Sequence, residues 1–498
     1  MNHAIEAAST RSTACTIGGV TLLEIAFLAA VFLGAFTVRV WPLSKIHFWD
    51  EAVYLQDAEV ICCGKTNYSD LDSRPPLLSL IFAAVFLAWH NVYAADIVTA
   101  ILNAAGPVLL YFCGRRIVGR RAAATAALLM AFIPFFVGVF PIGFDSDNTG
   151  NSLLTDEPSL TLLLLALLIM LRALRRNRTT EFALAGFVLG LAVLMRFASL
   201  LSVGVLGLLV FAGTRWFKAG LATVVGFMAA LLPYLVWSRV QYGGFLTTFQ
   251  RGWQYYEGAR ESPLFLLRNF GVMFSWITLA GLALWVARWL WTWRDKSANA
   301  DSEYAGQARL VPFLWLWAGL LFLFFVALPH QEPRYAMPLG PPLFLLAGSG
   351  LTVLLDFPRA TGRIAGTAAL ALALVYTFAP LRVVFGAPLI ERSSSEEMQV
   401  AEFLDQNLPP GTTLYSNFNY PLFAYYSHLP VHELPEAGPK LYSALDDLPG
   451  DGVLIVYTKP EIHPEPPPEW LAAHPEFKLW RRFPSIALYQ YRKIAAQR

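Results

Sequence analysis

The sequence predicts a polytopic α-helical membrane protein that ends in a small α/β domain. Of its 498 residues, 56% are hydrophobic and only 14% are charged, which is outside the usual composition of soluble globular domains. Apolar runs of about 20 residues, the length that an α-helix needs to cross a bilayer, recur along the chain as far as residue 382. Beyond residue 388 the composition changes to charged residues, prolines and short alternating runs.

We expect about eleven spans, and interfacial helices in the loop that follows the first span. The run from Ile17 to Val40 is long enough to span and lacks the short apolar core and small-residue cleavage site of a signal peptide, so residues 1–16 form a cytoplasmic N-terminus. The predicted spans cover residues 17–40, 94–114, 122–141, 157–172, 182–198, 199–214, 219–238, 266–290, 310–328, 338–356 and 363–382.

The basic residues predict the orientation of these spans, because cytoplasmic loops are enriched in lysine and arginine. Two apolar stretches, Pro76 to His90 and Val92 to Gly114, separate the first span from the first arginine block. With a cytoplasmic N-terminus, that block is cytoplasmic only if one of the two stretches does not cross the membrane. The stretch from Pro76 is about 15 residues long and follows a proline pair, so we expect it to lie in the interface. The expected cytoplasmic blocks are Arg115/Arg116/Arg120/Arg121, Arg172/Arg175/Arg176/Arg178, Arg215/Lys218, Arg288/Arg294/Lys296/Arg309 and Arg359/Arg363.

The C-terminal residues 386–498 then lie outside the membrane as a separate domain, after a transmembrane domain of residues 17–385. Its length of roughly 100 residues is an ordinary domain size. The expected elements are a helix at Glu396–Asn407 and strands at Leu414–Ser416, Val453–Tyr457 and Ile486–Tyr491.

The charge and the cysteines argue against nucleic-acid binding and against a metal site or disulfide framework. The net charge is only +2, and the arginines form short blocks rather than one stripe, which argues against binding of nucleic acid. The four cysteines, Cys15, Cys62, Cys63 and Cys113, have neither metal-site spacing nor the pattern of a disulfide framework, since adjacent cysteines seldom pair.

The first outer loop contains the most informative residues. Asp50, Tyr54 and Asp57 share one face if the segment is helical. A carboxylate at Asp50 is placed to accept a proton from an attacking hydroxyl, and the alternative is that Asp50 only caps the helix. Arg74, before Pro75-Pro76, puts a cation where a lipid phosphate would lie, and the alternative there is an interfacial arginine that snorkels.

Later outer segments add further candidates. Asp156 is one such candidate. Pro158 follows two residues later, in the first turn of the expected helix, so the alternative is that Asp156 caps this helix. Arg334 lies close to a membrane boundary beside His330 and Tyr335, a combination suited to a phosphodiester. Arg196 is a cation near the outer end of a span, where charges are functional candidates by default, although it also fits a snorkelling arginine.

These motifs occur in an order that resembles the GT-C glycosyltransferases, over residues 17 to 385. More narrowly, the chain resembles the bacterial protein O-mannosyltransferase-like branch, of glycosyltransferase family 39 type, which includes the lipid A aminoarabinose transferases. One departure is Arg74, where such chains often have lysine or histidine. The motifs are Asp50-Glu51-Ala52-x-Tyr54, Arg74-Pro75-Pro76-Leu77, Thr155-Asp156-x-Pro158, Leu191 to Arg196 and Arg334-Tyr335-x-x-Pro338.

The resemblance implies inverting transfer of a hexosyl or pentosyl group from a polyprenyl-phosphate carrier to a hydroxyl of a lipid, protein or glycan, at the outer face of a bacterial inner membrane. Asp50 would be the general base, Asp156 would orient acceptor or sugar, and Arg334 with Arg74 would neutralise the departing phosphate. No ligand cluster requires a metal and no cofactor is expected, although a divalent metal is possible because some GT-C relatives use one. The further substrate-binding candidates are Glu51, Tyr54, Arg196, His330 and Tyr335.

The competing interpretation is a transporter or flippase in which Asp50, Arg74 and Arg334 bind and gate a lipid-linked or anionic substrate. Three features disfavour it: most charges lie in outer loops rather than at mid-membrane, the long first outer loop has helices of its own, and no internal repeat is visible. A scaffold protein, the third possibility, would need none of these charges. The tail contains no motif of sugar chemistry, so we expect it to shape acceptor access.

Overall fold

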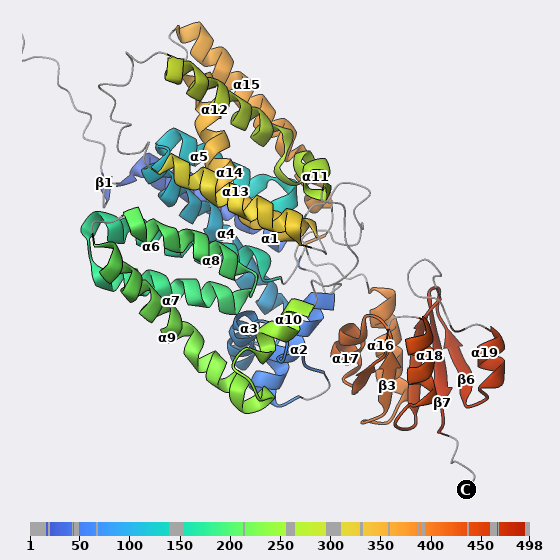
Figure 1. The fold of residues 1–498 in the computed structure, drawn as a ribbon. Coiled ribbons are helices and arrows are strands. Elements are labelled where there is room, and N and C mark those ends of the chain that lie inside the picture. Colours follow the sequence, from blue (N-terminus) through green and yellow to red (C-terminus); the bar gives the residue numbers. More distant parts are fainter. Residues whose placement is uncertain are drawn as a thin grey trace, which may run out of the picture.

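The computed structural model describes residues 16–17, 20–41, 43, 49–65, 68–138, 154–212, 215–254, 264–294, 310–328, 332–356, 359–386, 388–389, 394–435, 438–458, 466 and 468–493. The described helices between residues 22 and 386 form a bundle that makes up most of the molecule, and a small sheet domain packs against one end of it (Figure 1). Two short strands, β1 (Thr16–Ile17) and β2 (Val20–Thr21), pair before the first helix.

The helices of the bundle follow the apolar runs of the sequence. They are α1 (Leu22–Val40), α2 (Trp49–Cys63), α3 (Leu77–Ala88), α4 (Val92–Ile117), α5 (Arg120–Phe132), α6 (Asp156–Arg176), α7 (Thr179–Met195), α8 (Ser199–Gly207), α9 (Trp216–Tyr242), α10 (Thr247–Gln254), α11 (Phe265–Phe274), α12 (Trp276–Arg294), α13 (Val311–Ala327), α14 (Gly340–Leu351) and α15 (Ala360–Phe378). The main 3₁₀ segments are η1 (Pro134–Val137), η2 (Leu208–Ala212), η4 (Pro333–Leu339), η5 (Thr352–Leu355) and η6 (Ala379–Gly386).

The polytopic fold class is confirmed, whereas the number of spans stays a prediction. Within the described residues, six helices are long and apolar enough to cross a membrane, and the pair α11–α12, bent by 100°, adds a seventh if it counts as one span. Each of the expected spans overlaps one of the helices of the bundle. Helix α3 has only 12 residues, about 18 Å of helix, and is too short to cross a hydrocarbon core of about 30 Å.

Small residues bring the helices of the bundle close together. A Cβ added to Gly186 of α7 would lie 2.0 Å from the Thr223 carbonyl of α9, and one added to Gly226 of α9 would lie 1.9 Å from the Ala183 carbonyl. In lipid, where burial of apolar surface gives little drive for association, such close backbone packing is a main source of helix–helix stability.

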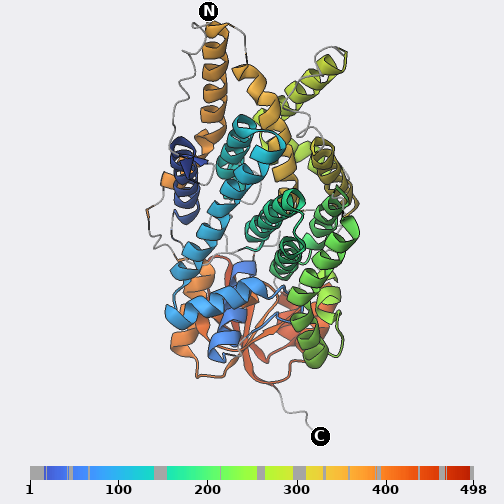
Figure 2. The same cartoon turned by 90° about the vertical axis from the view of Figure 1, so that its left-hand side faces the viewer.

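The two ends of the bundle differ in chemistry. At one end, arginines of the predicted cytoplasmic blocks share carboxylates: Arg120 lies 3.5 Å from Glu24, and Arg121 and Arg288 lie 3.2 and 3.9 Å from Asp356. At the other end, α2 and α3 lie beside the C-terminal domain (Figure 2). This separation is what the positive-inside interpretation requires.

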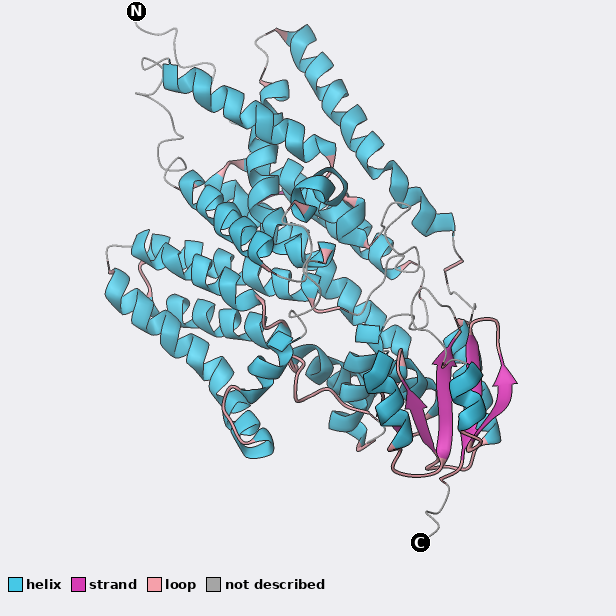
Figure 3. Cartoon of the chain, turned by 45° about the vertical axis from the view of Figure 1, so that its right-hand side comes forward, coloured by secondary structure: helices cyan, strands magenta, loops and turns pink. Residues whose placement is uncertain are grey.

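The C-terminal domain contains a five-stranded mixed sheet with helices on both faces (Figure 3). The strand order is β4-β3-β5-β7-β6. Strands β4, β3 and β5 are parallel to one another, and β7 is antiparallel to both of its neighbours, β5 and β6. The strands are β3 (Thr413–Ser416), β4 (Val431–Glu433), β5 (Gly452–Tyr457), β6 (Phe477–Arg482) and β7 (Ile486–Tyr491), and the helices are α16 (Glu396–Asn407), α17 (Tyr420–Ser427), α18 (Gly438–Asp446) and α19 (Pro468–Ala473).

The cysteine expectation needs one correction. Cys62 and Cys63, the adjacent pair that we expected not to bond, are joined as a disulfide in the last turn of α2. Cys113 is free and buried in α4.

The predicted orientation can be tested by labelling single cysteines in a variant whose four native cysteines are replaced by serine. Ser69 and Asn177 are both exposed in the structure and belong to opposite ends of the bundle. Ser69→Cys should react with an impermeant maleimide in cells whose outer barrier is opened, whereas Asn177→Cys should react only after the inner membrane is lysed. The reverse order of labelling would contradict the orientation.

Candidate active site

Helix α2 carries the first group of candidate residues and is buried despite its position in an outer loop. Every residue from Asp50 to Glu59 is buried. Of the three residues expected to share a face, Asp50 and Tyr54 line one cavity, whereas Asp57 is not among the residues that line it. Asp50 is the second residue of α2 and both its carboxylate oxygens face guanidinium groups, so it does not serve as the helix cap.

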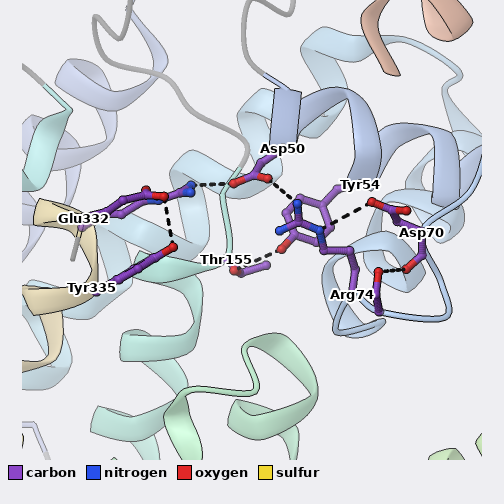
Figure 4. A network of polar contacts seen from close by, with 9 residues as sticks. Asp50, Tyr54, Asp70, Arg74, Thr155, Glu332 and Tyr335 are labelled. Atoms are coloured by element: carbon purple, nitrogen blue, oxygen red, sulfur yellow. Dashed lines mark hydrogen bonds and ion pairs between the residues drawn. The ribbon is translucent and has the colours of Figure 1, made fainter. Parts of the chain in front are cut away.

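Two arginines hold the Asp50 carboxylate between them (Figure 4). Arg74 Nη2 lies 2.9 Å from Asp50 Oδ1, and Arg334 Nη1 donates to Asp50 Oδ2 at 2.6 Å although the two residues are 284 positions apart. Burial alone would raise the pKa of Asp50, but the charges of Arg74 and Arg334 and the hydrogen bond from Arg334 outweigh it and hold the pKa below its ordinary value. Asp50 is therefore ionised at neutral pH.

A second carboxylate–arginine pair lies beside the first. Asp156, the first residue of α6, pairs with Arg196, which follows the last residue of α7. The Tyr335 ring lies close to both cations, 5.2 Å from the Arg196 guanidinium and 5.7 Å from that of Arg334. Two arginines, each paired with an aspartate, therefore lie beside one aromatic ring.

Glu332 and Thr155 complete the network. Glu332 pairs with Arg334 and accepts a hydrogen bond from the Tyr335 hydroxyl at 3.0 Å. The hydroxyls of Tyr54 and Thr155 are 3.4 Å apart and connect α2 to the start of α6. Burial raises the pKa of Tyr54 to about 12, so this phenol is neutral at neutral pH and can only form hydrogen bonds.

Apart from Glu332, these groups line a cavity of about 930 Å³ and form its polar end. Its polar end contains Asp50, Arg74, Asp156, Arg196 and Arg334. The remaining walls are mainly apolar and come from α8, α10, α13 and neighbouring residues: Phe197, Leu200, Leu201, Gly204, Val205, Leu208, Leu246, Phe249, Trp253, Leu320 and Phe324. The cavity can thus take a ligand that has one anionic end and one long apolar part.

Asp57 anchors the loop that presents Arg74. Its Oδ1 accepts hydrogen bonds from the Ser69 hydroxyl at 2.8 Å and from the Asp70 backbone N–H at 2.9 Å. The Asp70 carbonyl in turn accepts from the backbone N–H groups of Ser73, at 2.9 Å, and Arg74, at 2.8 Å. The Arg74 side chain then contacts Asp50. Helix α2 therefore contacts both ends of the segment from Ser69 to Arg74, through Asp57 at one end and Asp50 at the other.

Two predicted substrate-binding residues are not placed in the cavity. Glu51 is buried in α2 but is not among the residues that line the cavity, and its charge interacts with Asp96 of α4. His330 lies outside the described residues. Tyr54, Arg74, Arg196, Arg334 and Tyr335 all line the cavity together with Asp50 and Asp156.

Some residues of the site were not identified from the sequence. Glu332 stands two residues before Arg334, and Asp70 four residues before Arg74, so opposite charges at short spacing were the available signal. Arg39 of α1 pairs with Glu157, next to Asp156, at 2.8 Å, and a charge inside a span is itself a signal. Among the described residues, no three histidine, cysteine, aspartate or glutamate side chains gather as a metal site.

Comparison with known families supports the resemblance. Residues 73–237 match the model of the family described as dolichyl-phosphate-mannose-protein mannosyltransferase. That segment is about a third of the chain and contains Arg74, Asp156 and Arg196. No curated protein matches the sequence significantly.

Solved structures share the fold of the chain. The crystal structure of ArnT from Cupriavidus metallidurans bound to undecaprenyl phosphate matches with a TM-score of 0.62 at 16% identity, covering 94% of this chain and 98% of that one. The Archaeoglobus fulgidus oligosaccharyltransferase AglB, in complex with an inhibitory peptide and a dolichol-phosphate, matches with a TM-score of 0.56 at 13% identity, covering 87% and 69%. Residues 73–237 are thus similar to this mannosyltransferase family, and the chain shares its overall fold with ArnT and AglB.

Proposed function

We propose that the protein is an inverting glycosyltransferase that moves a sugar from a polyprenyl-phosphate carrier to a hydroxyl of a lipid, protein or glycan. The observation that carries this proposal is the cavity, in which three arginines and two aspartates meet at one end of largely apolar walls. The similar structures were solved with undecaprenyl phosphate and with a dolichol-phosphate. We place the reaction at the outer face of a bacterial inner membrane, where the predicted orientation puts this end of the bundle.

Arg74 and Arg334 are suited to the phosphate of such a donor. Guanidinium groups bind phosphate oxygens in pairs of parallel hydrogen bonds and keep their charge at any ordinary pH. Both side chains are only 17% exposed, so their attraction for an anion is screened less than at the surface. The apolar walls from α8 and α13 would then accept the polyprenyl chain.

Asp50 is the group best placed to take the proton of the acceptor. The acceptor oxygen attacks the anomeric carbon, the bond from that carbon to the phosphate oxygen breaks, and the polyprenyl phosphate leaves with the bonding electrons. The acceptor proton passes to Asp50. One displacement of this kind inverts the anomeric configuration, and the arginines stabilise the charge that develops on the leaving phosphate.

Competition for the two arginines explains how an ion-paired carboxylate becomes a useful base. In the empty site Arg74 and Arg334 lower the pKa of Asp50, which weakens it as a base. A bound phosphate competes for the same guanidinium groups. As each one turns towards phosphate, the proton affinity of Asp50 rises, so that base strength appears only when donor is present.

The second pair would orient the sugar. Asp156 accepts hydrogen bonds from donors such as sugar hydroxyls, and Arg196 keeps it in place from the adjacent helix end. The ring of Tyr335 offers an apolar face beside these polar groups.

Asp50→Asn keeps the size of the side chain but removes the proton acceptor. We expect turnover to fall about 10²- to 10⁴-fold, the usual contribution of a general base, while the protein still inserts and binds polyprenyl phosphate. The measurement is transfer of radiolabelled sugar from a polyprenyl-phosphate donor by purified protein. A parallel reaction with a chelator shows whether transfer depends on a divalent metal. Asp405→Asn, an exposed position on α16, serves as the control.

Near-normal turnover of the Asp50→Asn variant would remove Asp50 from its role. Movement of the donor across the membrane without any sugar transfer by the wild-type protein would favour the transporter interpretation instead.

Substitution of Asp57 tests whether the Arg74 loop must be anchored. Burial raises the pKa of Asp57 to about 7, and its Oδ2 atom has no partner among the described residues, so that oxygen can carry the proton. Asp57→Asn keeps an acceptor for Ser69 and Asp70 and should transfer sugar at nearly the wild-type rate. Asp57→Ala leaves these buried donors unpaired and should lose about 10-fold or more.

The raised pKa also predicts a pH dependence of stability. The folded protein holds the Asp57 proton more tightly than the unfolded chain, so this contribution to stability falls as pH rises from about 4 to about 7. The melting temperature of the wild type, taken relative to Asp57→Asn, should therefore decrease over this range. A difference that rises with pH, or equal activity of the alanine and asparagine variants, would contradict the anchoring role.

A further inference from the structure

Helix α17 of the C-terminal domain belongs to two cores at once. Phe423 packs inside the domain with Leu414 of β3 and Ile455 of β5. Its neighbour Leu422 instead joins the buried cluster of the outer loop, which contains Leu55 of α2 and Phe82 of α3. Adjacent residues of one helix thus connect the sheet domain to the helix that carries Asp50.

An aromatic cluster at the start of α17 contacts both segments that hold the Asp50–Arg74 pair. The Tyr420 ring lies 4.5 Å from Trp49, edge to face, and 5.3 Å from Tyr68. Trp49 directly precedes Asp50, and Tyr68 directly precedes the residues Ser69 and Asp70 that Asp57 anchors. Tyr420 is only 4% exposed, so these contacts are not surface contacts.

The sheet holds Tyr420 firmly from its own side. Asn419, which links β3 to α17, has a φ of 48° in the left-handed region that asparagine tolerates better than most residues. Its side-chain amide donates to the Tyr457 hydroxyl at 3.2 Å and to Glu397 at 3.4 Å, and the Tyr457 hydroxyl donates to Glu397 at 3.1 Å. The position of Tyr420 is therefore fixed by β3, β5 and α16 together.

We propose that Tyr420 is a positioning residue for sugar transfer: its ring, held by the C-terminal sheet, keeps Trp49 and Tyr68 in place so that Asp50 and Arg74 meet. This inference rests on the proposed function, in which Asp50 and Arg74 act on the acceptor and the phosphate. It extends the expectation that the tail only shapes acceptor access, because the tail also supports the catalytic helix. A displacement of about 1 Å in such a site can cost about 10²-fold in rate.

The test separates a role in positioning from general loosening of the domain. We compare Tyr420→Ala, which removes the ring, with Tyr420→Phe, which keeps it. The control is Tyr491→Ala, which removes an equally buried ring on the other face of the same sheet, where Tyr491 packs 4.8 Å from Phe477. All variants are measured as full-length protein in the radiolabelled transfer assay.

We expect Tyr420→Ala to lower kcat about 10- to 100-fold with little change in KM for the donor, and Tyr420→Phe and Tyr491→Ala to stay within a few-fold of wild type. Equal losses for Tyr420→Ala and Tyr491→Ala, or failure of phenylalanine to restore kcat, would overturn the proposal. So would a loss confined to KM.

A double-mutant cycle with Trp49→Ala provides a second test that does not need the tyrosine variant to be fully stable. If Tyr420 acts through Trp49, Trp49→Ala alone should lower kcat to a similar extent, and the double variant should be scarcely worse than either single one. Effects that multiply would show that the two rings act separately and would overturn the proposal. A wild-type protein without transfer activity would contradict the proposed function itself, whereas an active Tyr420→Ala beside an inactive Asp50→Asn would contradict only the positioning role.

Discussion

The Asp50 carboxylate, held between Arg74 and Arg334, is the interaction on which the rest of the structure depends. A buried carboxylate is unfavourable without partners, and removal of one partner from such a group is strongly destabilising. Arg74 lies in the loop before α3 and Arg334 lies in η4, and both side chains reach Asp50 of α2. The bundle must therefore hold distant segments in register to keep a small group of charges paired.

Several features of the fold serve that requirement. Asp57 fixes the loop before Arg74 from the same helix that carries Asp50. Glu332 pairs with Arg334 and orients Tyr335 beside it. On the side away from the membrane bundle, α17 covers α2 and contacts Trp49. Helix α2 carries the candidate base and is also packed between the bundle and the C-terminal domain. This packing explains why a helix in an outer loop is buried along most of its length.

The sequence predicted those features that depend on local pattern. Apolar runs of sufficient length located the helices of the bundle, and the spacing of Asp50, Tyr54 and Asp57 placed them on one helical face. The strands β3, β5 and β7 were also expected, from short apolar or alternating runs in the sequence. Strands β4 and β6 were not, since most of their residues are exposed and have no clear alternation.

The sequence could not predict contacts between distant segments. No local pattern relates Asp50 to Arg334, which is 284 residues away, or brings Tyr420 to Trp49. Glu51 shows the same limit for residues that are neighbours in the sequence. It adjoins Asp50 in the motif, yet the turn of the helix directs it away from the cavity, towards the region of Asp96. Only the packing of the bundle decides which charges of a motif reach the site.

In the proposed mechanism the donor phosphate and Asp50 share the same two arginines. This sharing is tested most directly by a structure of the protein bound to a polyprenyl phosphate. We expect phosphate oxygens within hydrogen-bonding distance of Arg74 and Arg334, at least one of the two contacts to Asp50 lengthened beyond hydrogen-bonding distance, and the polyprenyl chain along α8 and α13. A phosphate bound elsewhere, with both contacts between Asp50 and the arginines unchanged, would contradict it.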